Sequence, residues 1–159
     1  MSQFRVEKRR VEAEVLLANG ASVRGSFFLA GSSAGHVGPE RVADLLNAET
    51  GFFPFAPAGT GIGETVMINR AHVVSVRLLD RNGEPQLDSG YVLATERRVA
   101  MLLSTGMRII GAVRVYRPEG RDRLSDYARS TDAFRYIENG DGTFVVNSAH
   151  IVELWETLS

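Results

Sequence analysis

The strongest constraint on the fold of this chain is that its sequence contains two copies of one pattern. Blocks of similar residues recur in the same order, and the spacing between copies changes only in glycine- and serine-rich or turn-like stretches. Changes in loop length cost little free energy there. The matching blocks are 14–20 with 100–106, 41–44 with 123–126, Phe52 with Phe134, and 66–74 with 144–152. We therefore expect two copies of one supersecondary unit.

Each copy opens with a predicted pair of strands. Apolar and polar residues alternate over residues 11–17 and 23–29, and the second copy repeats this alternation. A period of two indicates strands with one buried face, and the Asn-Gly pair at residues 19–20 is typical of a tight turn. Gly25 and Gly111 occupy the same place inside the second strand of each copy. Glycine at such a place indicates a sharp bend or the close approach of another backbone.

A short helix and a second pair of strands complete each copy. Residues 39–47 combine an early proline with apolar residues at helical spacing, and residues 121–130 are their counterpart. An Arg and an Asp three positions apart recur in both helices, where they share one face and are interpreted as a helix-surface or helix-docking pair. The phenylalanine-rich segment 52–55 is expected to be a core strand. Two further strands flank an Asn-x-Ala-His turn at residues 69–72 in one copy and a matching turn at 147–150 in the other.

The two copies are joined by a turn-rich segment. Residues 80–90 contain Asn-Gly and Glu-Pro pairs, which favour turns, so this segment is interpreted as a connector. The apolar residues 91–94 that follow it are expected to form an extra strand.

Composition limits the classes of function. The 159 residues include no cysteine, which excludes disulfides, thiolate metal sites and cysteine nucleophiles. Eighteen basic and nineteen acidic residues give a net charge of −1, so no overall charge draws the chain to nucleic acid or anionic lipid. No apolar run approaches the roughly 20 residues that span a bilayer, and no secretory signal is recognised. We expect a cytoplasmic protein with no membrane partner.

The sequence contains no pattern that indicates catalysis. Its histidines, His36, His72 and His150, lie outside any carboxylate–histidine metal motif. The glycine-rich segment 59–63 lacks the Lys-Ser/Thr of a phosphate-binding loop, and no Gly-x-Ser-x-Gly elbow occurs. We expect no metal, no cofactor and no catalytic residue, and hence a protein that is not an enzyme.

These residues resemble the Sm/Lsm family. Its first motif has an alternating apolar strand, a turn glycine and a second glycine five positions later, a spacing that Gly20 with Gly25 and Gly106 with Gly111 reproduce. Its second motif, a short strand, a tight polar turn and another strand, is similar to residues 66–76 and to their counterparts at the end of the chain. More narrowly, the chain resembles an uncharacterised bacterial family of Sm-like proteins that have a helix inserted after strand two.

The resemblance implies a mainly β fold. It consists of two tandem Sm-like (SH3-type) barrels, small, strongly bent and five-stranded, each with a short helix inserted between strands 2 and 3. The expected organisation is a first unit at 1–80, a connector at 81–90 and a second unit at 91–159. Sm-like subunits close their strand edges in rings, and a domain of about 60–70 residues is marginally stable alone. We therefore expect a homo-oligomer, either a dimer or a pseudo-symmetric ring.

Two functions follow as hypotheses. The first is a non-enzymatic assembly or interaction module that self-associates through its strand edges and binds protein partners not yet identified. The alternative is single-stranded RNA binding through the two Asn-x-Ala-His turns, although the acidic residue, the Asn and the Arg-Gly pair of the Sm pattern are missing from the corresponding loops. The candidate RNA-binding residues are Asn69, Arg70, His72, Asn147 and His150, with Lys8, Arg9 and Arg10 as additional phosphate contacts.

Overall fold

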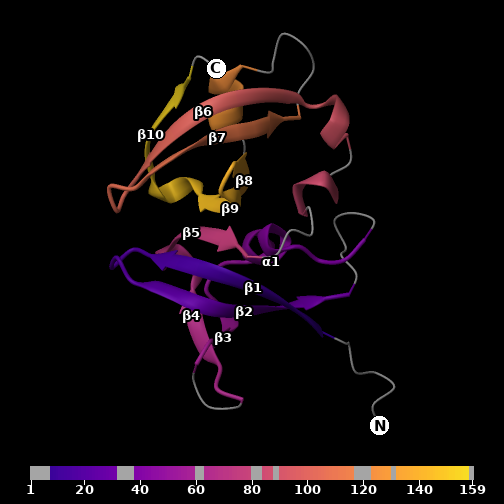
Figure 1. The fold of residues 1–159 in the computed structure, drawn as a ribbon, viewed down its shortest axis with the longest axis vertical. Helices are drawn as coiled ribbons and strands as arrows, with labels where there is room; N and C mark the ends of the chain where they lie inside the picture. Colours follow the sequence, from indigo (N-terminus) through magenta and orange to yellow (C-terminus); the bar gives the residue numbers. More distant parts are fainter. Residues whose placement is uncertain are drawn as a thin grey trace.

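The computed structural model describes residues 8–31, 38–59, 63–79, 84–87, 90–116, 123–129 and 132–157. Within them the protein is mainly β, which confirms this part of the prediction: ten antiparallel strands form one sheet, accompanied by two α-helices (Figure 1). The strands are β1 (Lys8–Leu17), β2 (Ser22–Ala30), β3 (Phe52–Pro57), β4 (Val66–Asn69), β5 (Val73–Leu78), β6 (Thr95–Leu103), β7 (Arg108–Val115), β8 (Phe134–Asn139), β9 (Gly142–Asn147) and β10 (Ile151–Glu156). The helices are α1 (Val42–Ala48) and α2 (Leu124–Ala128), with 3₁₀ turns η2 (Arg70–His72), η3 (Glu84–Leu87), η4 (Tyr91–Leu93) and η5 (Ser148–His150).

The sheet runs continuously through both halves of the chain. Its strand order is β10-β6-β7-β8-β9-β5-β1-β2-β3-β4, so β5 of the first half pairs directly with β9 of the second. Figure 1 shows this pair at the middle of the molecule, between the two halves. Strands β4 and β10 stand at the two ends of the sheet, and in the described part of the chain each pairs on one side only.

The strand pairings repeat in register, as the internal repeat predicts. Ala13 pairs with Gly25 as Val99 does with Gly111. Phe52 pairs with Asn69 as Phe134 does with Asn147. Leu17 pairs with Val73 as Leu103 does with Ile151. Both halves also have a bulge where the first strand meets the last. The finer expectation of two Sm-like barrels stays a prediction.

The glycines inside the second strands allow the third strands to come very close. A Cβ atom added to Gly25 would lie 2.2 Å from the carbonyl oxygen of Ala56, and one added to Gly111 would lie 2.4 Å from that of Glu138. Real Cβ atoms are not found at such distances, so only glycine fits. The prediction of a close backbone approach is confirmed in both halves.

The Arg and Asp of each helix close its first turn. The backbone N–H of Arg41 donates to Asp44 Oδ2 at 2.8 Å, and that of Arg123 donates to Asp126 Oδ2 at 3.1 Å. The first contact places the start of α1 at Val42, later than the predicted residue 39. Of the second predicted helix, at 121–130, residues 121–122 and 130 lie outside the described residues. Neither helix of the described chain is long and apolar enough to cross a lipid bilayer.

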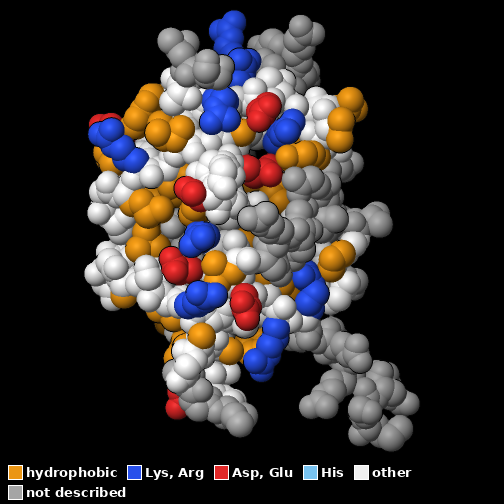
Figure 2. Space-filling model, in the orientation of Figure 1, with side chains coloured by type: hydrophobic (Ala, Val, Ile, Leu, Met, Phe, Trp, Pro, Cys, Tyr) orange, Lys and Arg blue, Asp and Glu red, His pale blue; other side chains and the backbone are white. Residues whose placement is uncertain are grey.

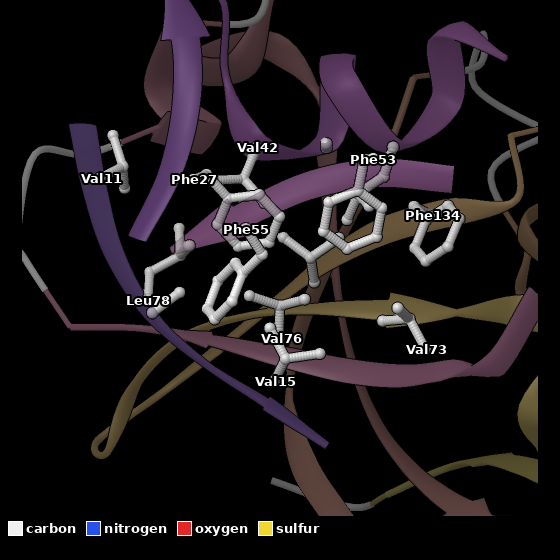
Figure 3. Packing of buried hydrophobic residues seen from close by; sticks show 14 of the residues in the cluster. Val11, Val15, Phe27, Val42, Phe53, Phe55, Val73, Val76, Leu78 and Phe134 are labelled. Atoms are coloured by element: carbon white, nitrogen blue, oxygen red, sulfur yellow. The ribbon is translucent and has the colours of Figure 1, made fainter. Parts of the chain in front are cut away.

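Aromatic side chains from both halves fill the first core (Figure 3). Phe27 stacks on Phe53 at 5.4 Å between ring centroids and meets Phe55 edge to face at 5.2 Å. Phe134 of the second half belongs to the same buried cluster, so this core extends across the junction between halves. The core interpretation of segment 52–55 is therefore right for Phe53 and Phe55. It is wrong for Phe52, which is 57% exposed.

The extra strand predicted at residues 91–94 is wrong. Gly90 adopts a positive φ of 80° and begins the 3₁₀ turn η4, in which Ala94 N–H donates to the carbonyl oxygen of Gly90 at 2.9 Å. The left-handed backbone at Gly90 breaks the extended conformation that a strand requires. The sheet resumes at Thr95.

Candidate functional site

The junction of β5 with β9, here called the inner seam, is the strand pairing that joins the two halves of the chain. Ser75 pairs with Val146, Val76 with Val145 and Arg77 with Phe144. Val145 of the second half packs into the first core. Val74 of the first half packs into a second buried cluster, which contains Met101 and Ile137 of the second half. Because each half supplies a side chain to the core of the other, the inner seam is part of the folded interior.

Asn147 fastens the end of β9 to β5. Its side chain is buried, and its Nδ2 donates to the carbonyl oxygen of Val73 at 2.9 Å. Its Oδ1 accepts from Ala149 N–H at 3.0 Å, as Asn69 Oδ1 does from Ala71. Each Asn thus bonds the backbone of its own turn, which is the usual role of Asn at such a place, and Asn147 also bonds across the two halves.

His150 also bridges the two halves. Its Nε2 lies 2.8 Å from the carbonyl oxygen of Ala71, in the turn after β4, and its Nδ1 lies 2.8 Å from Ser104 Oγ. A carbonyl group only accepts, so Nε2 carries a proton, and in the neutral ring Nδ1 accepts from the hydroxyl group. The turn of the second half is thereby fastened to the turn of the first.

Asn69 and His72 are the counterparts of Asn147 and His150. Asn69 is the last residue of β4, the strand at the end of the sheet, and His72 belongs to the turn η2 that joins β4 to β5. His72 is exposed, and in the described chain neither residue makes the cross-half contacts of its counterpart. The structure therefore separates the five predicted site residues: Asn147 and His150 contact the inner seam through their side chains, whereas the first turn takes part there through the carbonyl oxygen of Ala71.

Arg70 is buried and holds α1 against the sheet. Its Nη1 donates to the carbonyl oxygen of Phe52 at 2.7 Å, and its Nη2 donates to that of Leu45 at 3.0 Å. Its guanidinium carbon lies 5.5 Å from the ring centroid of Phe53, and only 4% of the residue is exposed. The guanidinium group of Arg70 is therefore part of the folded interior and not of the surface.

Glu84 of the connector joins both halves, and sequence reasoning missed it. Its Oε1 accepts from Val42 N–H at 3.0 Å, at the start of α1, and from Tyr136 Oη at 2.8 Å, on β8. Burial raises the pKa of Glu84 above its ordinary value, and burial together with the nearby Glu84 charge raises the pKa of Tyr136. A Glu-Pro pair in a turn-rich segment gives no signal for burial, so only the structure reveals this contact.

The open edge at β4 carries apolar side chains that are buried at the corresponding place in the second half. Val66 is 42% and Met67 is 59% exposed, whereas their counterparts on β9, Phe144 and Val145, are 7% and 0% exposed. The difference arises because β9 is covered by β5, and nothing in the described residues covers the outer side of β4.

The open edge at β10 shows the same contrast. Val152 is 61% exposed, and its counterpart on β5, Val74, is fully buried. Trp155 on the same strand is 36% exposed. The two ends of the sheet therefore both present apolar surface, and they are the counterparts of the two strands that meet at the inner seam.

One open cavity of about 370 Å³ lies beside the inner seam. Charged groups of both signs line it, from Glu14, Arg77 and Asp141, beside the apolar Leu16 and Phe144. The described residues contain no group of three or more His, Asp or Glu side chains that would hold a metal ion. His36 lies outside the described residues.

Comparisons with protein-family models, with curated proteins and with solved structures give no match for this chain.

Proposed function

We propose that this protein is a non-enzymatic assembly module, built of two Sm-like units, that associates with further copies of itself through its strand edges. The units are 1–80 and 91–159, joined by 81–90. Three features of the fold support them: the repeated strand pairing, the helix inserted after the second strand, and the glycine-mediated contact of second and third strands.

One observation carries the proposal of self-association. In the part of the chain that the structure describes, the sheet has two open edges, and both expose apolar side chains whose counterparts are buried at the inner seam. An open strand edge presents unpaired N–H and C=O groups and invites another strand, most of all when its side chains are apolar. Covering these edges with further copies removes both the open backbone and the exposed apolar surface.

The alternative of single-stranded RNA binding gains no specific support. Arg70 and Asn147, two of its five candidate residues, are buried and bonded to main-chain carbonyls. Figure 2 shows basic and acidic side chains interspersed on the face that it presents, without a continuous basic track. RNA binding stays a prediction for the remaining residues. A mobility-shift assay with U-rich and A-rich RNA at low salt tests it, because phosphate contacts weaken as salt rises.

Sedimentation velocity combined with native mass spectrometry tests self-association. We expect discrete complexes of several chains at micromolar concentration, which dissociate on dilution. A strict monomer at that concentration would overturn the proposal.

A variant with a charge introduced on the edge strand β4, compared with a control variant on an inner strand, tests whether the edge is the contact. Met67→Lys places a cation on β4, an arrangement that blocks strand pairing, and we expect it to shift the distribution to the monomer. Ile110→Lys is the control, because Ile110 is 53% exposed but lies on β7, which has strands on both sides. Equal effects of the two variants would show that the edge is not the contact.

A further inference from the structure

We propose that Ser104 is a nucleophilic serine, activated by His150, that accepts one acyl group from an activated carboxylic ester. The Oγ atom of Ser104 lies 2.8 Å from Nδ1 of His150, and Nε2 of the same ring lies 2.8 Å from the carbonyl oxygen of Ala71. A hydroxyl group beside an imidazole that a third group orients is the arrangement of an activated nucleophile. This site of covalent modification does not depend on self-association of the chain.

The carbonyl group of Ala71 decides which nitrogen of the His150 ring carries the proton. A carbonyl oxygen only accepts, so in the neutral ring Nε2 holds the single proton and donates it to Ala71. The Nδ1 atom then has a free lone pair at hydrogen-bond distance from the hydroxyl group of Ser104. A neutral imidazole held in this way is a general base, within reach of the proton that it removes.

Both halves of the chain are needed to build this arrangement. Ser104 follows β6 and His150 ends η5, both in the second half, whereas Ala71 belongs to η2 of the first half. The peptide group of Ala71 is itself held, because its N–H donates to Asn69 Oδ1 at 3.0 Å. The backbone N–H of Ser104 also donates to the carbonyl oxygen of His150 at 2.8 Å. The reacting side chains are therefore positioned by the fold and not by chance contact at the surface.

The first half has the same backbone at the matching place but lacks the reactive pair. The counterpart of Ser104 is Ala18, whose N–H donates to the carbonyl oxygen of His72 at 2.8 Å, as Ser104 N–H does to His150. Ala18 has no hydroxyl group, and among the described residues the His72 ring has no hydrogen-bond partner. Within the described chain, the hydroxyl group and the orienting carbonyl group thus meet in the second half alone.

The exposed position of Ser104 gives an acyl donor in solution access to its Oγ atom. In the reaction, Oγ forms a bond to the acyl carbon, and the bond from that carbon to the leaving group breaks. The proton of the hydroxyl group passes to Nδ1 of His150 and from there to the leaving group. The products are an acylated serine and the released alcohol or thiol.

The surroundings of the pair limit the class of acyl donor. The His150 ring is oriented by a neutral carbonyl group and not by a carboxylate, so the charge that the ring gains with the proton receives less stabilisation. Neither residue lines the cavity beside the inner seam, so that cavity does not hold a donor next to Ser104. The site therefore suits thioesters and aryl esters, which have good leaving groups. We expect one transfer per chain without rapid turnover, as in a protein that is not an enzyme.

Acetylation by p-nitrophenyl acetate tests the proposal on the native chain. Peptide mapping by mass spectrometry locates the acetyl groups, and the single lysine, Lys8, leaves few amines to compete for the ester. We expect Ser104 to be acetylated about 100-fold faster than Ser22, an exposed serine on β2. Equal rates for the two serines, or an acetyl group on His150 with Ser104 unmodified, would overturn the proposal.

Unfolding the chain in urea provides the first control. Because the fold brings Ala71 to His150, we expect Ser104 to react no faster than Ser22 in urea. A rate at Ser104 that is the same in the folded and the unfolded chain would overturn the proposal. This control uses the native sequence, so it decides even where a variant fails to fold.

Three variants separate the parts of the site. His150→Gln keeps a side-chain N–H donor but removes the base, and we expect acetylation of Ser104 to fall about 100-fold. His72→Gln is the matched control and leaves that rate unchanged. Ala18→Ser adds a hydroxyl group beside His72, whose ring no carbonyl group orients in the described chain, so we expect no rapid acetylation at position 18. A rate there equal to that of Ser104 would overturn the role of Ala71, and an unchanged rate in His150→Gln would overturn the role of the base.

Discussion

Arg70 and Arg135 donate to equivalent helix carbonyl groups from different places in the repeat. Arg70 Nη2 lies 3.0 Å from the carbonyl oxygen of Leu45 in α1, and Arg135 Nη1 lies 2.6 Å from that of Tyr127, the counterpart of Leu45, in α2. Arg70 comes from the turn after β4, whereas Arg135 comes from β8 at the counterpart of Phe53. A cation near the last carbonyl groups of a helix is favourable. Each half has such a cation, but the arginine that supplies it stands at a different position of the repeat.

Replacing Arg70 with Lys is expected to destabilise the fold. Lysine presents a point charge and cannot donate to Phe52 and Leu45 in the planar geometry of a guanidinium group. Leaving buried acceptors without a partner costs about 1–3 kcal/mol, which urea unfolding of the dilute monomer measures. Arg24→Lys is the control, because Arg24 is exposed on β2. A similar loss in both variants would contradict the structural role of Arg70.

Gly25→Ala is expected to be more costly than an ordinary surface substitution. The added methyl group meets the Ala56 carbonyl oxygen at 2.2 Å, so β2 and β3 must separate. Overpacking of this kind costs roughly 1–3 kcal/mol or more, and chemical unfolding reports it. Gly31→Ala is the matched control, since nothing lies within 4 Å of its Cβ position. Equal stability of the two variants would refute the close approach.

Asn147→Asp separates the bond of Asn147 within its own turn from its bond across the inner seam. The new carboxylate keeps the acceptor for Ala149 N–H but replaces the donor to Val73 with a buried charge that faces a carbonyl oxygen. We expect a loss of about 2 kcal/mol or more from the free energy of unfolding. The equivalent Asn69→Asp change in the dilute monomer should cost much less, because Asn69 lies at the open edge. If the order of the two effects is reversed, the inner seam is not where Asn147 acts.

Removing the carboxylate of Glu84 is expected to loosen the junction between the halves. Glu84→Ala leaves Val42 N–H and Tyr136 Oη without their acceptor, at a cost of about 2 kcal/mol. Glu84→Gln keeps an acceptor oxygen at the same place, so its stability at neutral pH is expected within about 1 kcal/mol of the native chain. Thermal unfolding measures both. An alanine variant as stable as the glutamine variant would contradict the contact.

The same residue predicts a dependence of stability on pH. Because burial raises the pKa of Glu84 in the folded chain, the folded state holds the proton more tightly than the unfolded state. The stability that the proton confers is therefore fully present below the ordinary value of 4.5 and is lost as pH rises through the raised pKa. Measured against pH, the unfolding free energy of the native chain should fall relative to Glu84→Gln over that interval. Parallel curves for the two proteins would rule out the raised pKa.

Local patterns in the sequence predicted the paired strands, their turns and the places of both helices, but they also predicted a strand at residues 91–94 that is wrong, and they placed the start of α1 too early. Alternation of apolar residues marks strands such as β1, and glycine at residues 25 and 111 marks the close approach of the third strands. The pairing of β5 with β9 has no local signal, because a pattern along the chain predicts a strand but not which strand of the other half pairs with it. For the same reason the bond of His150 to Ala71 was not predicted, although the residue itself was named as a site candidate.

The inner seam has a consequence for how the molecule can be altered. In an assembly of identical single units, any substitution on an edge strand appears at every junction. Here a change on β9 affects only the junction inside the chain, and a change on β4 affects only the outer side. In the proposed assembly, substitutions on β9 and on β4 therefore alter the junction inside the chain and the contact between copies independently of each other, which a ring of unfused subunits does not permit.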